Sequence, residues 1–357
     1  MNPSDLIRER IRTSGPISFA EFMDLALYGP GGFYEDPPVG ERGHFVTSPH
    51  VHPVFGLLLA RAVTIMWDAM DEPGPPMIVE IGAGDGTLAS QLLTEIPDAG
   101  YVAVERSEGS RRRLASAGIR AASDISELEP RQTTVVVANE LLDNLAFHRV
   151  RMSGAGIMEL LVDLEGDRFV EREAGCPPGL AEASPRLEAG EEAAVCLAVT
   201  SFIGHLAPVI GRGYVLLIDY GRTPREPGGG VRGYRDQNII EDLLSDPGTA
   251  DITAGVNFEA VTRAAVAEGM QVFTHATQGQ ALLALGFERW TNEQRDLQIR
   301  RLNEGAGREA VRTWSGRNAA QLLVDPRELG SLTWMTVATH GLPAPPWVTA
   351  TTEGSRG

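Results

Sequence analysis

The segment Ile78–Leu88 constrains the fold more than any other part of the chain. It reads Ile-Val-Glu-Ile-Gly-Ala-Gly-Asp-Gly-Thr-Leu, an apolar run followed by three alternate glycines and then by residues with helical spacing. Alternate glycines let a ligand meet the backbone without a Cβ clash, and the start of a helix offers free N–H groups to a carboxylate. We therefore predict a strand, a ligand-binding turn at Gly82, Gly84 and Gly86, and a helix. An ordinary strand-to-helix turn without a ligand is the plainer alternative.

The residues around these glycines narrow the choice of ligand. Thr87 and Leu88 stand where the dinucleotide-binding fingerprint has one further residue and then glycine, so a dehydrogenase is a distant alternative. Glu80, just before the turn, favours a ligand that carries an amine, such as the methionyl end of S-adenosylmethionine (SAM). On these grounds we expect SAM as the cofactor and S-adenosylhomocysteine as its product.

Two acidic residues are expected to contact the rest of the cofactor. Glu105 ends the apolar run Tyr101–Glu105, about 20 residues beyond the turn, where a carboxylate accepts hydrogen bonds from both ribose hydroxyls. A solvated carboxylate at a strand end is the alternative. Asp124 follows the short apolar stretch Gly118–Ala122 and is assigned to the adenine amino group, with a helix N-cap as an equally weighted alternative.

A third polar cluster follows the apolar run Thr133–Ala138. Ligands of open α/β sheets bind outside the carboxyl ends of such strands. We expect Asn139 and Glu140 to face the transferring methyl group, with Asn139 also touching the cofactor. Asp143, three residues on, returns to the same side on a helical turn, so all three are candidate catalytic residues. Acidic residues in the first turn of a helix, favoured there by the helix dipole, would give the same pattern.

Short apolar runs alternate with helical stretches after the breaker at residues 72–76. This order is typical of a parallel sheet with crossover helices, and continuously apolar runs suit strands covered on both faces. We predict an α/β fold of the class I methyltransferase type, a Rossmann-like and mostly parallel sheet of seven strands. Its strands include Met77–Ile81, Tyr101–Glu105, Thr133–Ala138, Tyr214–Asp219, Gln271–Ala276 and Leu332–Thr339. Its helices include Pro3–Thr13, Ser18–Leu27, Val54–Met70, Thr87–Ile96, Gly109–Ala117, Glu192–Ile210 and Phe258–Glu268.

The chain divides into three predicted regions. Residues 1–75 are expected to form an N-terminal helical lid and substrate region, residues 76–345 the methyltransferase core, and residues 346–357 a flexible tail. The core carries two insertions, at about 146–190 and about 279–328. The first has alternating apolar residues and glycine turns, which indicate antiparallel strands, and the second is helical.

The predicted lid contains a Gly/Pro-rich loop at residues 28–34, which a packed helix or strand would not tolerate. The loop cannot bury all of its own aromatic side chains, so these are expected to pack on an inserted side chain of the methyl acceptor. A lid that only covers the cofactor is the alternative. The residues expected along the acceptor's path are Tyr28, Phe33, Tyr34, Thr47 and Ser48.

Composition excludes several classes of partner. The net charge of −17 argues against nucleic acid as a partner, because neutralising phosphates requires clustered basic residues.

Cys176 and Cys196 form neither a CxxC pair nor a disulfide framework, so a reducing cytoplasm is expected. No apolar run approaches the roughly 20 residues of a membrane helix. His44, His50 and His52 lack further ligands at metal-binding spacing, so no metal is expected.

A series of short segments along the chain is more particular than packing requires. In order, they are Gly15–Phe19, Phe22-Met23, Leu27–Tyr34, Phe45–Pro49, Phe55-Gly56, the glycine turn, Ala138–Asp143, Ile218–Gly221, Asp251–Thr253 and Val256–Phe258. Together they resemble the MidA family of SAM-dependent methyltransferases, which is implicated in assembly of respiratory complex I. The resemblance spans nearly the whole chain.

The resemblance implies N-methylation of arginine in a protein partner that exposes this residue. It places the family's glycine-turn residues at Gly82, Gly84 and Gly86, and its Asn-Glu motif at Asn139 and Glu140.

The chain also departs from the family pattern. His44 stands where Asp is usual, His50 where Glu is usual, Ala146 where Pro is usual, and Gln237-Asn238 where a His is common. Because the departures leave the acceptor open, two alternatives are kept. One is a small-molecule N- or O-methyltransferase, and the other is an assembly factor that binds SAM without turnover.

Overall fold

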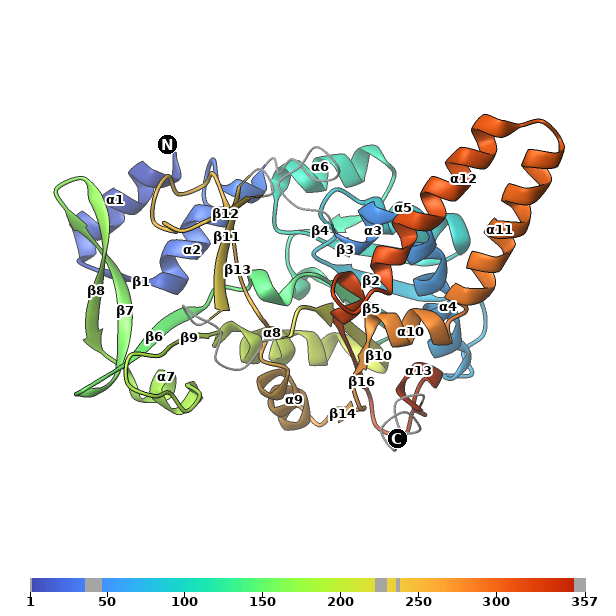
Figure 1. Ribbon diagram of the computed structural model, residues 1–357. Helices are drawn as coiled ribbons and strands as arrows, with labels where there is room; N and C mark the ends of the chain where they lie inside the picture. Colours follow the sequence, from blue (N-terminus) through green and yellow to red (C-terminus); the bar gives the residue numbers. More distant parts are fainter. Residues whose placement is uncertain (1, 36–46, 222–229, 236–237, 350–357) are drawn as a thin grey trace.

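The computed structural model describes residues 2–35, 47–221, 230–235 and 238–349. At its centre is a sheet in the order β14-β16-β10-β5-β2-β3-β4, with β15 also paired to β16 (Figure 1). Pairing is parallel from β10 to β4 and antiparallel on both sides of β16. The strands are β2 Met77–Ile81, β3 Gly100–Val104, β4 Ala121–Ala122, β5 Gln132–Asn139, β10 Ile210–Asp219, β14 Gln271–Val272, β15 Ala276–Thr277 and β16 Thr333–Ala338. The predicted α/β class is confirmed, although the strand expected at 271–276 is divided into two short pieces.

Helices cover both faces of this sheet because successive strand residues point to opposite sides and both sets are apolar. Ile78 and Val135 face one side, where they pack with α4 and α5. Val79 and Val136 face the other side and pack with α8 and α9. The bounds are α4 Val54–Asp68, α5 Thr87–Glu95, α6 Glu108–Ser116, α8 Ala198–Leu206 and α9 Phe258–Ala267.

The N-terminal segment packs against the first insertion. Strand β1 pairs with β7, so the segment joins the antiparallel sheet β1-β7-β6-β9, to which β8 adds on β7. Phe19 and Phe22 share an apolar cluster with Phe147 and Val162. The elements are α1 Pro3–Ser14, β1 Ile17–Ser18, α2 Phe19–Tyr28, η1 Phe33–Glu35, α3 Ser48–Val51, β6 His148–Ser153, β7 Gly156–Glu165, β8 Arg168–Gly175, α7 Pro178–Ala183 and β9 Glu192–Val195.

Two parts of the chain differ from their expected structure. The helix predicted for 192–210 starts only at α8, because residues 192–195 pair with β6 as β9 and Glu192 binds Arg149 and Arg151 there. A three-stranded sheet, with β11 between β12 and β13, was not predicted. The remaining bounds here are η2 Ile125–Glu127, η3 Leu142–Asn144, η4 Ala207–Val209, β11 Val231–Arg235, β12 Asn238–Ile240 and β13 Asp251–Ala254.

The second insertion forms a helical hairpin that projects away from the sheet (Figure 1). Its helices are α11 Phe287–Asn303 and α12 Gly307–Ala320, and it is preceded by α10 Gln278–Ala284 and followed by η6 Gln321–Leu323 and η7 Leu329–Ser331. The tail expected from 346 begins instead with α13, Pro346–Thr349, because the fully buried Trp347 packs on Trp334.

The described part of the chain contains no helix that combines the length and the apolar character needed to cross a bilayer.

Candidate active site

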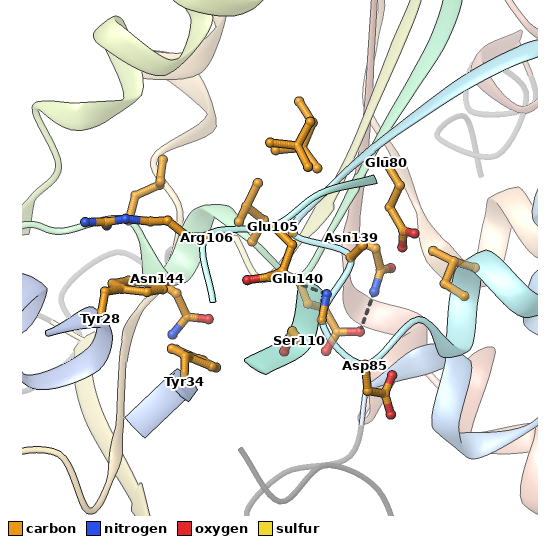
Figure 2. A pocket seen from close by; sticks show the side chains of 18 of the residues that line it. Tyr28, Tyr34, Glu80, Asp85, Glu105, Arg106, Ser110, Asn139, Glu140 and Asn144 are labelled. Atoms are coloured by element: carbon orange, nitrogen blue, oxygen red, sulfur yellow. Dashed lines mark hydrogen bonds between the residues drawn. The ribbon is translucent and has the colours of Figure 1, made fainter. Parts of the chain in front are cut away.

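A cavity of about 360 Å³ lies beyond the carboxyl ends of β2, β3 and β5. Tyr28, Tyr34 and Arg106 lie on one side of it and Glu80 and Asp85 on the other (Figure 2). Of the residues predicted for the site, it is lined by Tyr28, Tyr34, Thr47, Glu80, Gly82, Gly84, Glu105, Asp124, Asn139 and Glu140. Gly86, Asp143, Phe33 and Ser48 do not line it.

The glycine turn holds three positive φ angles, which favour glycine. These are 76° at Gly82, 55° at Gly84 and 85° at Gly86. A Cβ at Gly82 would lie 2.8 Å from Leu141, and one at Gly86 would lie 2.8 Å from Leu114. No atom lies within 4 Å of the corresponding position at Gly84. Gly84 is therefore the glycine that leaves room for a ligand, whereas the other two allow close packing.

Glu105 holds the turn in place. Its buried carboxylate accepts hydrogen bonds from the backbone N–H groups of Gly84, at 2.8 Å, and Ser107, at 2.7 Å. Burial raises the pKa of Glu105 despite these bonds. Each carboxylate oxygen can accept a further hydrogen bond, so the side chain is suited to a ligand with two hydroxyl groups.

Glu80 and Asp124 occupy different environments at the cavity. Glu80 is buried, and burial raises its pKa to about 8 although the Tyr101 hydroxyl donates to it. A cationic group nearby would therefore be needed to favour its charged form at neutral pH. Asp124 is exposed and caps η2 by accepting from the Ser126 N–H at 2.9 Å, so the predicted N-cap is present on a residue that also lines the cavity.

Glu140 sits in a backbone conformation unusual for its type, with φ of 51°. Its N–H donates to the Ile218 carbonyl at 2.7 Å, which fixes the turn after β5. The carboxylate accepts from the Ser48 N–H at 2.9 Å. It also accepts from the Asn139 side-chain amide at 3.1 Å (Figure 2). Burial raises the pKa of Glu140, and the Oδ1 atom of Asn139 has no partner among the described residues.

Asp143 belongs to a buried acidic group rather than to the cavity wall. Asp219 fixes η3 by accepting from the N–H groups of Leu141 at 3.0 Å and Leu142 at 2.6 Å. Asp143 is 9% exposed, and its Oδ1 atom has no partner among the described residues. Burial, together with the charges of Asp219 and Asp251, raises the pKa of Asp143. Burial also raises the pKa of Asp219 to about 7 and that of Asp251 to about 6.

The aromatic residues of the expected lid divide into two sets. The rings of Tyr28 and Tyr34 stack with centroids 5.3 Å apart, and Arg106 lies over Tyr28. The Tyr34 hydroxyl donates to Asp251 at 2.8 Å. The structure does not expose Phe33, which packs in the apolar cluster beneath the lid.

Ser48 also differs from its expected position on the acceptor's path. It is fully buried, and its hydroxyl donates to Gln278 while its N–H donates to Glu140. These contacts attach α3 to both the Asn-Glu turn and α10.

His50 and Asp85 were not predicted for the site. His50 Nε2 lies 3.0 Å from Asp85 and its Nδ1 lies 2.7 Å from the Thr47 hydroxyl. Burial raises the pKa of Asp85, but hydrogen bonds from His50 and Thr87 outweigh this and lower it to about 2. Asp85 stands between two glycines of the motif, so its side chain must lie near the ligand. This position is the sequence signal that could have identified Asp85 as a site residue.

No three His, Cys, Asp or Glu side chains in the described ranges are arranged to hold a metal ion. His44 and Gln237, two of the departures noted in the sequence, lie outside the described residues.

Comparisons with known proteins identify the family of the chain. A family model described as "Putative S-adenosyl-L-methionine-dependent methyltransferase" matches residues 58–276. The protein arginine methyltransferase NDUFAF7, mitochondrial, of Xenopus laevis is 27% identical over 326 residues, 78% of this chain and 73% of that protein. Its Drosophila melanogaster homolog is 26% identical over 374 residues, 91% and 82% of the two chains. A Burkholderia thailandensis crystal structure bound to S-adenosyl-homocysteine has a TM-score of 0.84 and 26% identity, and covers 99% of this chain and 95% of that one.

The comparisons correct the predicted location. The relatives from frog and fly are mitochondrial proteins by name, which contradicts the expected cytoplasm. The expectation rested on two cysteines without a disulfide framework. That feature reports on redox conditions and does not distinguish one reducing compartment from another.

Proposed function

The chain belongs to this family of SAM-dependent methyltransferases, and from that premise we propose that its methyl acceptor is an arginine side chain of a protein. SAM is its cofactor, as predicted. The observation that carries the proposal is the buried carboxylate of Glu140 on the cavity wall, with the acidic group of Asp143, Asp219 and Asp251 behind it. The relatives named as protein arginine methyltransferases point to the same acceptor.

The cavity fits the cofactor. Gly84 leaves open space beside the N-terminus of α5, where free N–H groups suit the methionyl carboxylate. We assign the amine to Glu80, the ribose to Glu105 and the adenine to Asp124. Asn139 would contact the cofactor near its methyl group. When bound, SAM supplies an electrophilic methyl group.

The chemistry of arginine explains the need for several carboxylates. A guanidinium has five N–H donors, no acceptor, and a pKa above about 12. Its nitrogen must lose a proton when it is methylated. Glu140, which lines the cavity, would orient the donors and accept this proton, and burial raises the pKa of its carboxyl group toward that role. Asp143, behind the cavity wall, would add negative charge beside the guanidinium. A site of this kind disfavours acceptors that present an anion.

We also assign the lid role to residues 1–75. Tyr34 is tied to Asp251, and α3 is tied to Glu140 through the Ser48 N–H. Residues of the N-terminal segment therefore touch both sides of the acidic group. Holding the acceptor in one orientation and excluding water are the main contributions expected of such a site.

Transfer of radiolabel from SAM to proteins of a mitochondrial extract, followed by acid hydrolysis and amino-acid analysis, tests the proposal. We expect labelled methylarginine with the wild-type chain and none with Glu140→Gln. Label found only in small metabolites would favour the small-molecule methyltransferase. Binding of SAM without any transfer would favour the assembly factor.

A further inference from the structure

Ser110, in the first turn of α6, is a residue of the cavity wall to which no role has been assigned (Figure 2). It is 1% exposed, and its Oγ atom has no hydrogen-bond partner among the described residues. Buried polar groups in native proteins nearly always have a partner, because leaving one unpaired costs free energy. In the described ranges, Asn139 is the other residue of the cavity wall with such an unpaired atom, and it is already assigned to the cofactor. Ser110 therefore marks a second point where a bound molecule completes the hydrogen bonding of the wall.

The start of α6 connects Ser110 to the carboxylate that we assign to the ribose. The Ser107 N–H donates to Glu105 at 2.7 Å, and the Ser107 hydroxyl accepts from the Ser110 N–H at 3.2 Å. Glu105 and Ser110 thus belong to one hydrogen-bonded turn that follows the carboxyl end of β3. A ligand held by Glu105 lies beside this turn.

The N-terminal segment covers this turn. The Ser107 hydroxyl donates to the backbone carbonyl of Glu35, at the end of η1, at 3.4 Å. The same carbonyl leaves no room for a Cβ on Gly109. Because this cover keeps bulk water from Ser110, the partner of its hydroxyl has to come from within the cavity.

Glu105 and Ser110 differ in what they offer to a ribose. An ionised carboxylate only accepts hydrogen bonds, whereas a serine hydroxyl also donates one. A ribose hydroxyl has one proton and two lone pairs, so it can donate to Glu105 and still accept from a second group. Rotation about the single χ1 bond of Ser110 moves its hydroxyl between staggered positions and lets it turn toward the cavity. A ribose hydroxyl held by Glu105 supplies the acceptor that the Ser110 hydroxyl lacks.

We propose that Ser110 is a further cofactor-binding residue, whose hydroxyl donates a hydrogen bond to a ribose hydroxyl of SAM. Glu105 would hold the ribose by accepting hydrogen bonds and Ser110 by donating one. The proposal rests on the assignment of the ribose to Glu105 and is independent of the identity of the methyl acceptor. The segment Glu108–Ser116 reads as an ordinary polar helix, so the sequence alone gives no sign of this role.

Calorimetry with S-adenosylhomocysteine and with its 2′-deoxy and 3′-deoxy analogues tests this contact. We expect Ser110→Ala to weaken binding of S-adenosylhomocysteine by about three- to tenfold, the effect of losing one hydrogen bond. Against one of the two deoxy analogues, Ser110→Ala and the wild type should bind alike, because that ligand lacks the partner of the hydroxyl. Ser116→Ala is the matched control on the same helix, outside the cavity, and should bind as the wild type does.

Thermal unfolding without cofactor distinguishes binding from a structural role. Ser110→Ala removes a buried hydroxyl that has no partner in the described structure, so its melting temperature should not fall below that of the wild type. A hydroxyl that only supported the helix would lower the melting temperature when removed, and this result would count against the proposal.

The binding measurements can also overturn the proposal. Wild-type affinity for S-adenosylhomocysteine in Ser110→Ala would do so, as would a loss of equal size against both deoxy analogues. A loss that disappears only with the 3-deaza analogue would assign the hydroxyl to the adenine. Glu105→Ala, measured on the same ligands, separates the two assignments. If its loss does depend on the ribose hydroxyls, only the role of Ser110 is wrong, and if it does not, the ribose lies elsewhere and both assignments fail.

Discussion

Gly84 is the residue on which cofactor binding most depends. Its φ of 55° disfavours any side chain, and a Cβ there would point into open space of the cavity. Gly84→Val should therefore abolish SAM binding measured by calorimetry. Gly74→Val is the matched control, because Gly74 also has a positive φ of 85° and no atom within 4 Å, but lies outside the cavity. If both variants bind SAM as wild type does, the turn is not the cofactor site.

Glu105 has two functions that substitution can separate. It accepts the Gly84 N–H and, in our assignment, the ribose hydroxyls. Glu105→Ala should weaken SAM binding by about 1–3 kcal/mol, as expected for loss of a charged hydrogen-bond partner. Glu105→Gln retains one oxygen for Gly84, so it should lose less. Calorimetry that finds wild-type affinity in both variants would remove Glu105 from the cofactor site.

Glu140 should matter for transfer rather than for cofactor binding. Glu140→Gln keeps an oxygen for the Ser48 N–H and removes the charge. We expect SAM affinity to survive and the transfer rate to fall by orders of magnitude, because the lost interaction belongs to the transition state. The two measurements are calorimetry and label transfer. Equal loss in both would move Glu140 into the cofactor site.

Single residues were predictable where the backbone itself requires a residue type. The alternate glycines and the acid at the next strand end follow such rules. Asp219 and Asp251 were missed as site residues, because nothing in their own segments indicates that η3 and β13 meet beneath the lid. His50 was noted only as a rejected metal ligand and as a departure from the family, since its contact with Asp85 joins residues 35 positions apart.

A single substitution in the lid tests its role more clearly than a deletion does. Removing residues 1–14 would take Ile7 and Ile11 out of the apolar cluster that holds α2, so loss of activity would also follow from a disordered lid. Tyr34→Phe removes only the hydroxyl that donates to Asp251. We expect it to spare SAM binding and lower methylation of the protein acceptor, and Tyr34→Ala to lower it further. A wild-type methylation rate in both variants would remove the lid from the acceptor's path.

The acidic group that joins η3, β10 and β13 should make stability depend on pH. Burial raises the pKa of Asp219 from 3.8 to about 7 and that of Asp251 to about 6. Between about pH 4 and 7 the folded chain therefore binds more protons than the unfolded chain, and the contribution of these groups to the free energy of unfolding falls as pH rises. Urea unfolding should show a shallower fall for Asp251→Asn, which cannot titrate at this position. If stability falls with pH equally in the wild type and in Asp251→Asn, a group other than Asp251 causes the pH dependence.

Elements were predictable where the hydrophobic period was clear. The continuously apolar strands and the amphipathic helices have such periods, so the core sheet was expected correctly. Strand β9 was taken for the start of a helix because its side chains are small and acidic, and only its pairing with β6 decides its structure. The sheet of β11, β12 and β13 was missed for a similar reason, since its short strands depend on pairing between distant residues.

At the scale of the whole molecule, charge distinguishes possible partners. A net charge of −17 repels phosphate backbones and attracts basic protein segments. A basic methyl acceptor is therefore favoured over an acidic one.

This charge predicts how methylation responds to salt. Exposed charges more than about 10 Å apart are largely screened at 0.1 M salt, so attraction of a basic acceptor weakens as salt is added. The value of kcat/KM for an arginine peptide flanked by basic residues should fall steeply between low and moderate salt. It should change little for the same peptide with neutral flanks, which serves as the control. SAM affinity, measured in parallel, should stay nearly constant because the cofactor contacts are short and partly buried. If both peptides respond to salt alike, the acidic surface does not recruit the acceptor, and recognition must rest on contacts inside the cavity.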